Sequence, residues 1–384
     1  MLLNLPLEIV DKLFGYLDEK DQLNFADSHQ KLGSALLFHA CGRYAELDCS
    51  KFTDDELKVI LATCGYSVVK INIDLLVGTS VIELVPKYCS QLARAQLCVS
   101  NGNITAIKSI LSIKDLEFIQ IWSPGHVESD ILLDINTGCK RLEIFCISNS
   151  GVNHLQRLEN LEYLTIYSDS SASVNHILEE CVHLKKLKTL CVITAEDNTT
   201  CSVDHYHDLV YPQVESLTFM FCGLCAVLPS CPKLRSLTLF CNECRNVSIG
   251  QIIAKYALTL ERLTVQLEGP QINGFPAEVF LEVLGECKNL QSISMGTINV
   301  ITDVLNGHLD ALMNILMANG FNVHRRFLVT TGSSIAHEQM LKLVIVWIRD
   351  ETRDMRDKSE HFLLQETDYI SSEIWNLLSF QLNN

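Results

Sequence analysis

Two pairs of cysteines are the residues of this sequence whose spacing best fits a chemical task. Cys222 and Cys225 form one C-x-x-C pair, Cys241 and Cys244 form a second, and 15 residues separate the pairs. Four thiolates at this spacing match a structural zinc site. However, Cys222 follows a repeated apolar segment at the position where Asn242 stands in the next copy. We therefore expect a small buried thiol and no metal, and keep zinc as an alternative.

A second cluster, Asp204-His205-Tyr206-His207-Asp208, places two histidines between carboxylates. Such residues could bind a metal or share a proton, but in an enlarged polar connection they are more typical of solvated surface. The sequence has no glycine-rich phosphate loop, no nucleophile elbow and no cysteine set apart for thioester chemistry. We expect a non-catalytic protein without a cofactor. A metal-dependent enzyme that uses either cluster is the rival hypothesis.

The composition narrows the class of partner. The chain has 384 residues, of which 48% are hydrophobic, and its net charge is −16. This acidic balance argues against binding to nucleic acid or to anionic membranes. The apolar window Met340–Ile348 contains Lys342 and is too short to cross a bilayer. Without an export signal, the 16 cysteines predict reduced, buried thiols, so we expect a soluble protein of the cytoplasm, the nucleus or both.

An internal repeat occupies the middle of the chain and must position any site. The apolar pattern L-x-x-L-x-L recurs ten times at intervals of 19 to 30 residues. The first positions are Val68, Leu92, Leu116, Leu142, Leu161, Leu187, Val214, Leu234, Leu260 and Leu290. A cysteine precedes the first position by three residues in four copies, at Cys89, Cys139, Cys231 and Cys287. Tyr44, Leu47 and Cys49 suggest a degenerate opening copy.

The spacing and the strand-then-helix character of each unit resemble leucine-rich repeats, and the cysteines resemble their cysteine-containing subclass. The resemblance implies an α/β fold in which each unit supplies one strand and one helix. Because no unit buries its apolar face alone, neighbours stack into a curved solenoid with parallel strands on the concave face and helices on the convex face.

The N-terminal segment predicts a separate unit of three short helices. Pro6 suits a first helical turn, and Ile9, Leu13 and Leu17 fall on one helical face. Val10 and Phe14 widen this stripe beyond what one packed face needs. Asp21 is expected to cap a second helix, and residues 31–40 to form a third. A unit of about 40 residues lies near the limit below which a domain cannot bury enough surface alone, so we expect it to need a partner.

The order of residues in this segment resembles the F-box motif, LPxEIxxxIFxYLxxxD. The matching positions are Leu5, Pro6, Glu8, Ile9, Leu13, Phe14, Tyr16, Leu17 and Asp21. The resemblance implies a substrate receptor of a cullin-based SCF ubiquitin ligase that binds a Skp-type adaptor, and through it a cullin. It assigns the adaptor contacts to Leu5, Pro6, Ile9, Leu13, Phe14 and Leu17. An amphipathic cap on the first repeat is the alternative.

Strand geometry predicts which side chains a target protein would meet. Because alternate side chains point to opposite faces, positions 3, 5 and 7 of each repeat are expected on the concave face; in the fourth repeat these are Ile144, Cys146 and Ser148. The central columns carry Phe118, Trp122, Tyr163, Tyr167, Met220 and Phe240, which we predict to bind the target. Packing of these side chains on one another, or under a folded-back tail, is the alternative.

After residue 300 the pattern loosens. Residues 302–320, 335–361 and 370–383 predict helices, which we expect to cap the last repeat, with a docking helix as the alternative. The predicted domains are therefore an F-box at 1–43, a solenoid of about ten repeats at 44–300, and an irregular capping segment at 301–384. The predicted function is substrate recognition for a ubiquitin ligase; a leucine-rich-repeat scaffold without that role is the alternative.

Overall fold

The computed structural model describes residues 5–40, 42–124, 131–147, 154–168, 177–194, 209–220, 228–241, 249–267, 276–295, 304, 307–321, 327–331 and 362–366. The chain divides into two compact units. The first consists of Met1–Asp169 with His176–Leu187, and the second of Ser170–Asn175 with Lys188–Asn384. Within the described ranges, no helix has the length and apolar character needed to span a membrane.

The first unit opens with three helices, α1 (Leu7–Phe14), α2 (Glu19–Asp27) and α3 (Gln30–His39). Pro6 is the N-cap of α1, as its fixed φ allows. Asp18 caps α2, because its Oδ1 accepts a hydrogen bond from the Asp21 amide at 2.8 Å. The prediction that Asp21 is the cap is therefore wrong: α2 begins one turn earlier, and Asp21 lies inside it. His29 caps α3 through its Nδ1.

The same unit continues into a parallel sheet with one strand per repeat. Its strands follow the order of the sequence: β1 (Glu46–Asp48), β2 (Lys70–Ile73), β3 (Arg94–Cys98), β4 (Phe118–Trp122), β5 (Arg141–Ile147) and β6 (Tyr163–Ser168). The short strand β1 pairs with β2 through Leu47 and Ile71, which confirms the degenerate opening repeat.

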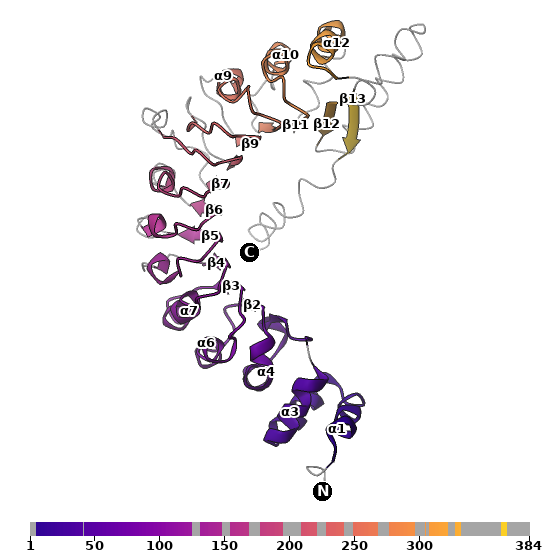
Figure 1. Cartoon of the computed structure of the whole chain (residues 1–384), viewed down its shortest axis with the longest axis vertical. Helices are drawn as coiled ribbons and strands as arrows, with labels where there is room; N and C mark the ends of the chain where they lie inside the picture. Colours follow the sequence, from indigo (N-terminus) through magenta and orange to yellow (C-terminus); the bar gives the residue numbers. More distant parts are fainter. Residues whose placement is uncertain are drawn as a thin grey trace. The chain divides into compact units, whose positions relative to one another are not determined.

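Helices cover one face of this sheet. They are α4 (Asp54–Cys64), α5 (Thr79–Ile82), α6 (Val85–Tyr88) and α7 (Ile104–Leu111), and Figure 1 shows α4, α6 and α7 on the same side of the strands. Helix α4 also packs against α2 and α3. Short 3-10 helices also lie in the connections, among them Cys49–Lys51, Gly65–Ser67 and Ile131–Asp134. The opposite face, which we call the open sheet face, is the one that carries Arg94, Phe118 and Arg141.

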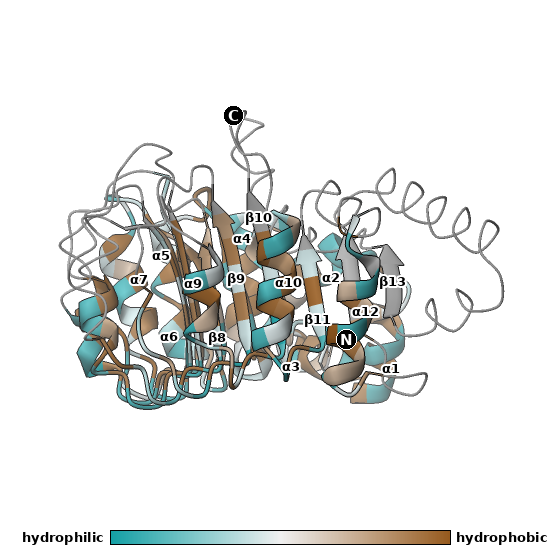
Figure 2. Ribbon diagram, turned by 90° about the horizontal axis from the view of Figure 1, so that it is seen from above, coloured by the Kyte–Doolittle hydropathy of each residue, from teal (hydrophilic) through white to brown (hydrophobic). Residues whose placement is uncertain are grey.

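The second unit repeats this plan. Its strands are β7 (Thr189–Thr194), β8 (Ser216–Met220), β9 (Ser236–Cys241), β10 (Arg262–Leu267), β11 (Ser292–Met295), β12 (Phe327–Thr331) and β13 (Phe362–Glu366), again parallel and in sequence order. Helices α9 (Ile249–Ala254), α10 (Ala277–Glu286) and α12 (Leu309–Ala318) lie on one side of strands β9 to β12. Figure 2 shows hydrophobic and hydrophilic residues side by side on α10 and α12.

The C-terminal part differs from the sequence expectation in one respect. Helix α12 confirms the helix predicted for residues 302–320, with its described part at Leu309–Ala318. Strands β12 and β13 were not predicted, and they extend the parallel sheet beyond β11. The helices predicted for residues 335–361 and 370–383 lie outside the described residues.

The repeated leucines form the core. The residues at the first position are almost completely buried in both units, as the pattern predicts; examples are Leu92, Leu116, Leu161, Leu234 and Leu260. Along the strands, buried and partly exposed side chains alternate, as in Lys70–Ile73. One parallel strand per repeat over a continuous apolar core is consistent with the predicted leucine-rich repeats.

The fourth repeat has a different register from the predicted one. Arg141 pairs with Phe118 on one side and with Tyr163 on the other, so it occupies position 3 of its repeat. Leu142 is therefore at position 4 and Cys139 at position 1. Ile144 is buried in the core and does not face the open sheet face, which corrects the prediction. Cys146 lies within this strand, but nothing is described of its side chain, and Ser148 lies outside the described residues.

Candidate partner-binding surfaces

Helix α1 carries apolar side chains on two faces. Val10 and Phe14 point into the core of the three helices and are buried, Phe14 completely. Ile9 is 42% exposed and Tyr16 is 88% exposed, and Leu5 is exposed beside them. A surface helix needs only one apolar stripe to pack on its own protein. We call this second stripe the outer stripe of α1; it contains Ile9 together with Leu5 and Pro6 just before the helix and Tyr16 just after it. It is available to another polypeptide, in agreement with the wide stripe seen in the sequence.

One of the six residues assigned to the adaptor cannot make that contact. Phe14 packs its ring against Phe25 and His39, with ring centroids 5.4 Å and 5.6 Å away. Its side chain has no exposed surface, so the assignment of Phe14 to the adaptor is wrong. Among the other five, the structure leaves Leu5, Pro6 and Ile9 exposed and Leu13 and Leu17 half-buried. Their contact with an adaptor stays a prediction.

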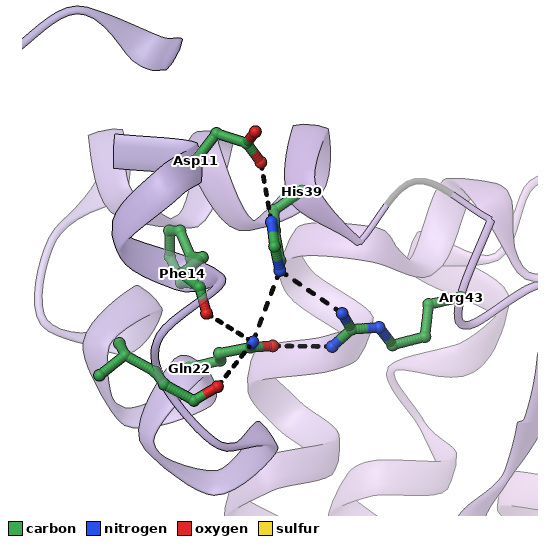
Figure 3. Close-up of polar contacts among 6 residues, drawn as sticks. Asp11, Phe14, Gln22, His39 and Arg43 are labelled. Atoms are coloured by element: carbon green, nitrogen blue, oxygen red, sulfur yellow. Dashed lines mark hydrogen bonds and ion pairs between the residues drawn. The ribbon is translucent and has the colours of Figure 1, made fainter. Parts of the chain in front are cut away.

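A polar cluster that the sequence reasoning missed fixes the orientation of α1 (Figure 3). The buried Gln22 side chain of α2 donates hydrogen bonds from Nε2 to the carbonyl oxygens of Phe14 and Leu17, at 2.8 Å and 3.0 Å. Arg43 in turn donates to Gln22 Oε1 at 2.7 Å. The Phe14 carbonyl also accepts a hydrogen bond from the Leu17 amide at 3.1 Å. By binding both carbonyls, Gln22 joins the end of α1 to α2.

The same cluster joins α1 to α3. His39 Nδ1 lies 2.7 Å from Asp11 Oδ1, and its Nε2 lies 3.5 Å from both Gln22 Nε2 and Arg43 Nη2. Each helix thus contributes at least one polar side chain to a single connected group (Figure 3). The available sequence signal was that Gln22 shares a helical face with the apolar Phe25 and Ala26, three and four residues further on. The cluster holds the outer stripe of α1 in one position relative to α2 and α3.

The open sheet face of the first unit is arranged in rows set by the strand register. One row contains Arg94, Phe118, Arg141 and Tyr163 at the amino ends of β3 to β6. A middle row contains Gln96, Gln120, Glu143 and Thr165, and a row near the carboxyl ends contains Cys98, Trp122, Phe145 and Tyr167. Positions in one row lie on neighbouring strands about 4.8 Å apart.

The predicted target-binding residues separate into two groups by burial. Trp122 and Tyr163 are each 42% exposed, while Phe118 and Tyr167 are half-buried. Met220 and Phe240, which lie in the second unit, are buried, and their assignment to an exposed surface is wrong. These two are register partners on β8 and β9, and Met220 is also paired with the buried Ile193 on β7. Burial within the chain, the alternative considered for these side chains, therefore applies to Met220 and Phe240.

Arg141 organises the centre of the open sheet face. Its guanidinium carbon lies 5.1 Å from the centroid of the Phe118 ring, a cation–π contact. Its Nη2 and Nε donate to Glu143 Oε1 at 2.6 Å and 2.8 Å. Because Glu143 is mostly buried and Arg141 is not, this pair fixes the guanidinium against the ring. The register error in the fourth repeat is the reason that sequence reasoning missed Arg141.

The cysteines behave as buried thiols where the structure describes them. Cys89, Cys139, Cys231 and Cys287 are buried, and burial raises the pKa of each thiol to about 12. Such thiols are poor nucleophiles and poor metal ligands at neutral pH. Of the predicted zinc cysteines, Cys241 ends β9. Cys222, Cys225, Cys244 and the cluster Asp204-His205-Tyr206-His207-Asp208 lie outside the described residues. Among the residues described, no three potential metal ligands come together.

We expect the free energy of unfolding to fall as the pH rises above 9. The folded thiols stay protonated up to about 12, while thiols of the unfolded chain ionise at the ordinary value of 9.0. The stability from a raised pKa is fully present below the unfolded value and is lost between the two values. Each thiol accounts for about 1.4 kcal/mol per pH unit in this window. Urea unfolding of wild type and Cys139→Ala at pH 8 to 10.5 should show a shallower dependence for the variant; equal slopes would contradict the prediction.

Comparison with known proteins identifies no family for this chain. No family model matches the chain, and no curated protein matches it. Among solved structures, it is similar to a chain of the "Crystal structure of Rad7 and Elc1 complex in yeast", with 14% identity and a TM-score of 0.43 over 93% of this chain and 94% of that chain. A likeness this distant carries no argument about function. Functional inference therefore depends on the residues of this chain.

Proposed function

We propose that this protein is the substrate-recognition subunit of a cullin-based SCF ubiquitin ligase. In this proposal the outer stripe of α1 binds a Skp-type adaptor, and through it a cullin, while the open sheet face holds the target protein. The protein itself performs no catalysis. It raises the concentration of the target near a ubiquitin-charged enzyme that other subunits supply.

One observation carries the proposal. The outer stripe of α1 is apolar and exposed, and it carries Leu5, Pro6 and Ile9 in the order that resembles the F-box motif. An amphipathic cap for the first repeat needs only the inner stripe of Val10 and Phe14. The outer stripe has no such use, so a second polypeptide is the better explanation.

A pull-down with a purified Skp-type adaptor tests the proposal. Ile9→Asp places a carboxylate in the outer stripe, and its burial in the interface without a partner should weaken binding about thirtyfold or more. Lys20→Asp is the control, because Lys20 is exposed on α2 and its substitution introduces the same carboxylate away from α1. The control should bind like wild type.

Two results would overturn the proposal. Wild-type protein that does not retain the adaptor would favour the alternative of a leucine-rich-repeat scaffold without a role in ubiquitin transfer. Equal retention of wild type and Ile9→Asp would place the adaptor elsewhere on the chain. Circular dichroism of both variants checks that the helices remain folded.

A further inference from the structure

We infer that the open sheet face, over β3 to β5, binds an extended acidic peptide segment that carries a large apolar side chain about four residues from an acidic one. The inference rests on the proposed function in one respect, because the peptide is taken to belong to the target protein. Four features of the surface carry it: an unpaired cation, an apolar end, an amide row between them, and the spacing along the strands.

The first feature is the charge at the amino ends of the strands. Lys70, Arg94 and Arg141 all lie in this row, on a chain whose net charge is −16. Lys70 pairs with Glu46 at 3.1 Å, and Arg141 pairs with Glu143 at 2.6 Å. The exposed Arg94 guanidinium forms no ion pair with any acidic side chain in the described ranges.

The position of Arg94 determines what it can attract. Its register neighbours are Lys70 on β2 and the Phe118 ring on β4. The nearby carboxylates are already engaged by other cations, Glu46 by Lys70 and Glu143 by Arg141. A partner carboxylate would therefore meet a guanidinium whose two neighbours in its row are a lysine and a phenylalanine. Arginine also suits planar, bidentate recognition of a carboxylate.

The second feature is the apolar end of the same surface. Trp122 is 42% exposed at the carboxyl end of β4, and the half-buried Tyr167 lies in the same row on β6. Phe145 lies between them and is buried, so the three aromatic side chains form one continuous apolar surface. Exposed tryptophan and tyrosine on a rigid sheet are typical anchors of protein interfaces. They suit a leucine or an aromatic side chain of the partner.

The third feature is the middle row. Gln96 Nε2 donates to Gln120 Oε1 at 2.7 Å, which fixes both amides in the plane of the surface. In the hydrogen bonds of the described residues, Gln96 Oε1 and Gln120 Nε2 are not used. They offer one acceptor and one donor to a peptide backbone. These two groups can therefore hydrogen-bond to the backbone of a peptide that crosses the row, whatever side chains the peptide carries there.

The fourth feature is spacing. Arg94 and Cys98 stand four residues apart on β3, and Cys98 is the register partner of Trp122. Four residues of strand span about 13 Å, and an extended peptide rises by the same distance per residue. A peptide that lies along β3 and β4 thus places its acidic and its large apolar side chains about four positions apart. A peptide selection can measure this spacing directly, because it appears as the distance between the two preferred residues in the selected sequences.

A display selection tests the inference on the purified full-length chain. The probe is an mRNA-displayed library of random twelve-residue peptides, selected separately on wild type, Arg94→Glu, Trp122→Ser and Arg262→Glu. Arg262 is the matched control, because it is exposed at the same position of its repeat on β10 and its substitution changes the net charge equally. Wild type and the control should enrich peptides with an acidic residue and a leucine or aromatic residue about four positions apart.

The variants should change this outcome in different ways. Arg94→Glu should replace the acidic residue by a basic one in the selected peptides, and should weaken a peptide selected on wild type about tenfold. Trp122→Ser should abolish the apolar preference and weaken the same peptide about thirtyfold, as measured by fluorescence anisotropy. A nucleic acid added as competitor should not displace the peptide.

The inference would be overturned if wild type enriched no peptides, if the selected peptides had no acidic bias, or if the nucleic acid displaced the peptide. It would also be overturned if the Arg94→Glu and Arg262→Glu substitutions altered the selected consensus to the same extent. None of these outcomes bears on the adaptor. If the protein retains the adaptor but selects no acidic peptide, the proposed function stands and this inference is wrong. If it selects acidic peptides but does not retain the adaptor, the inference about the surface stands and the proposed function is wrong.

Discussion

Phe14→Ala is expected to destabilise the N-terminal helices by about 3–5 kcal/mol. Phe14 is completely buried against Phe25 and His39, so truncation leaves a cavity that short helices cannot refill. Alanine keeps the backbone carbonyl that accepts from Gln22, so the expected loss comes from packing and not from this hydrogen bond. Hydrogen exchange read by mass spectrometry on peptides from residues 5–40 of the full chain should show amides that exchange about a hundredfold faster or more.

Ile9→Ala is the control for this experiment. Ile9 belongs to the same motif and the same helix, but it is exposed, so its truncation should change stability by about 0.5 kcal/mol or less. In the adaptor pull-down the order should be the opposite: when retention is normalised to the folded fraction, Ile9→Ala should weaken adaptor binding more than Phe14→Ala. Similar exchange rates for Phe14→Ala and wild type would contradict the two-face description of α1.

The contrast between Phe14 and Ile9 shows what the sequence reveals about this helix. The excess of apolar residues in the first helix predicts two roles, and the structure confirms two stripes. The motif does not say which residue belongs to which stripe. Val10 and Phe14 fall on one line along the helix and Ile9 and Leu13 on the adjacent line, and both lines are apolar. Only the positions of α2 and α3 decide which line is buried.

The strands were predictable to the extent that their apolar first positions were leucine or valine. Ten repeats give β2 to β11 at the expected places, and the opening copy gives β1. The sequence before β12 reads Arg325-Arg326, and the sequence before β13 reads Glu360-His361. Neither offers an apolar first position, so a search for the leucine pattern passes over both strands. What defines them is pairing in the folded sheet, of β12 with β11 and of β13 with β12.

The register of the fourth repeat was predicted wrongly for a different reason: two registers fit its sequence. The segments LEIFCI and CKRLEI both place apolar residues at positions 1, 4 and 6 when cysteine counts as apolar. The first starts with leucine and was preferred; the second is the one that pairs Arg141 with Phe118 and Tyr163. The choice moves every side chain of the strand to the other face. It hid Arg141 and Glu143, which shape the open sheet face beside Arg94.

Ile144→Asp tests this register with a large effect. In the observed register Ile144 is buried between β4 and β6, where it pairs with Ile121 and Ile166. A carboxylate there has no partner, and we expect a loss of about 4 kcal/mol or more in the free energy of unfolding of the first unit. In the LEIFCI register the same residue would face outward, and the substitution would cost almost nothing.

Gln96→Asp is the matched control, because Gln96 is a half-buried residue on the open sheet face of β3, and its register partners are the uncharged Asn72 and Gln120. It introduces the same carboxylate within reach of a surface that already carries Arg94 and Arg141, so its cost should stay near 1 kcal/mol, the value of the lost hydrogen bond. Urea unfolding of the full chain, with hydrogen exchange of residues 94–122 and 141–147 to locate the effect, measures both. A stable Ile144→Asp variant would return Ile144 to the surface and remove Arg141 from it. The cation–π pair with Phe118 would be lost from the proposed target-binding face in that case, and the acidic-peptide inference would then depend on Arg94 alone.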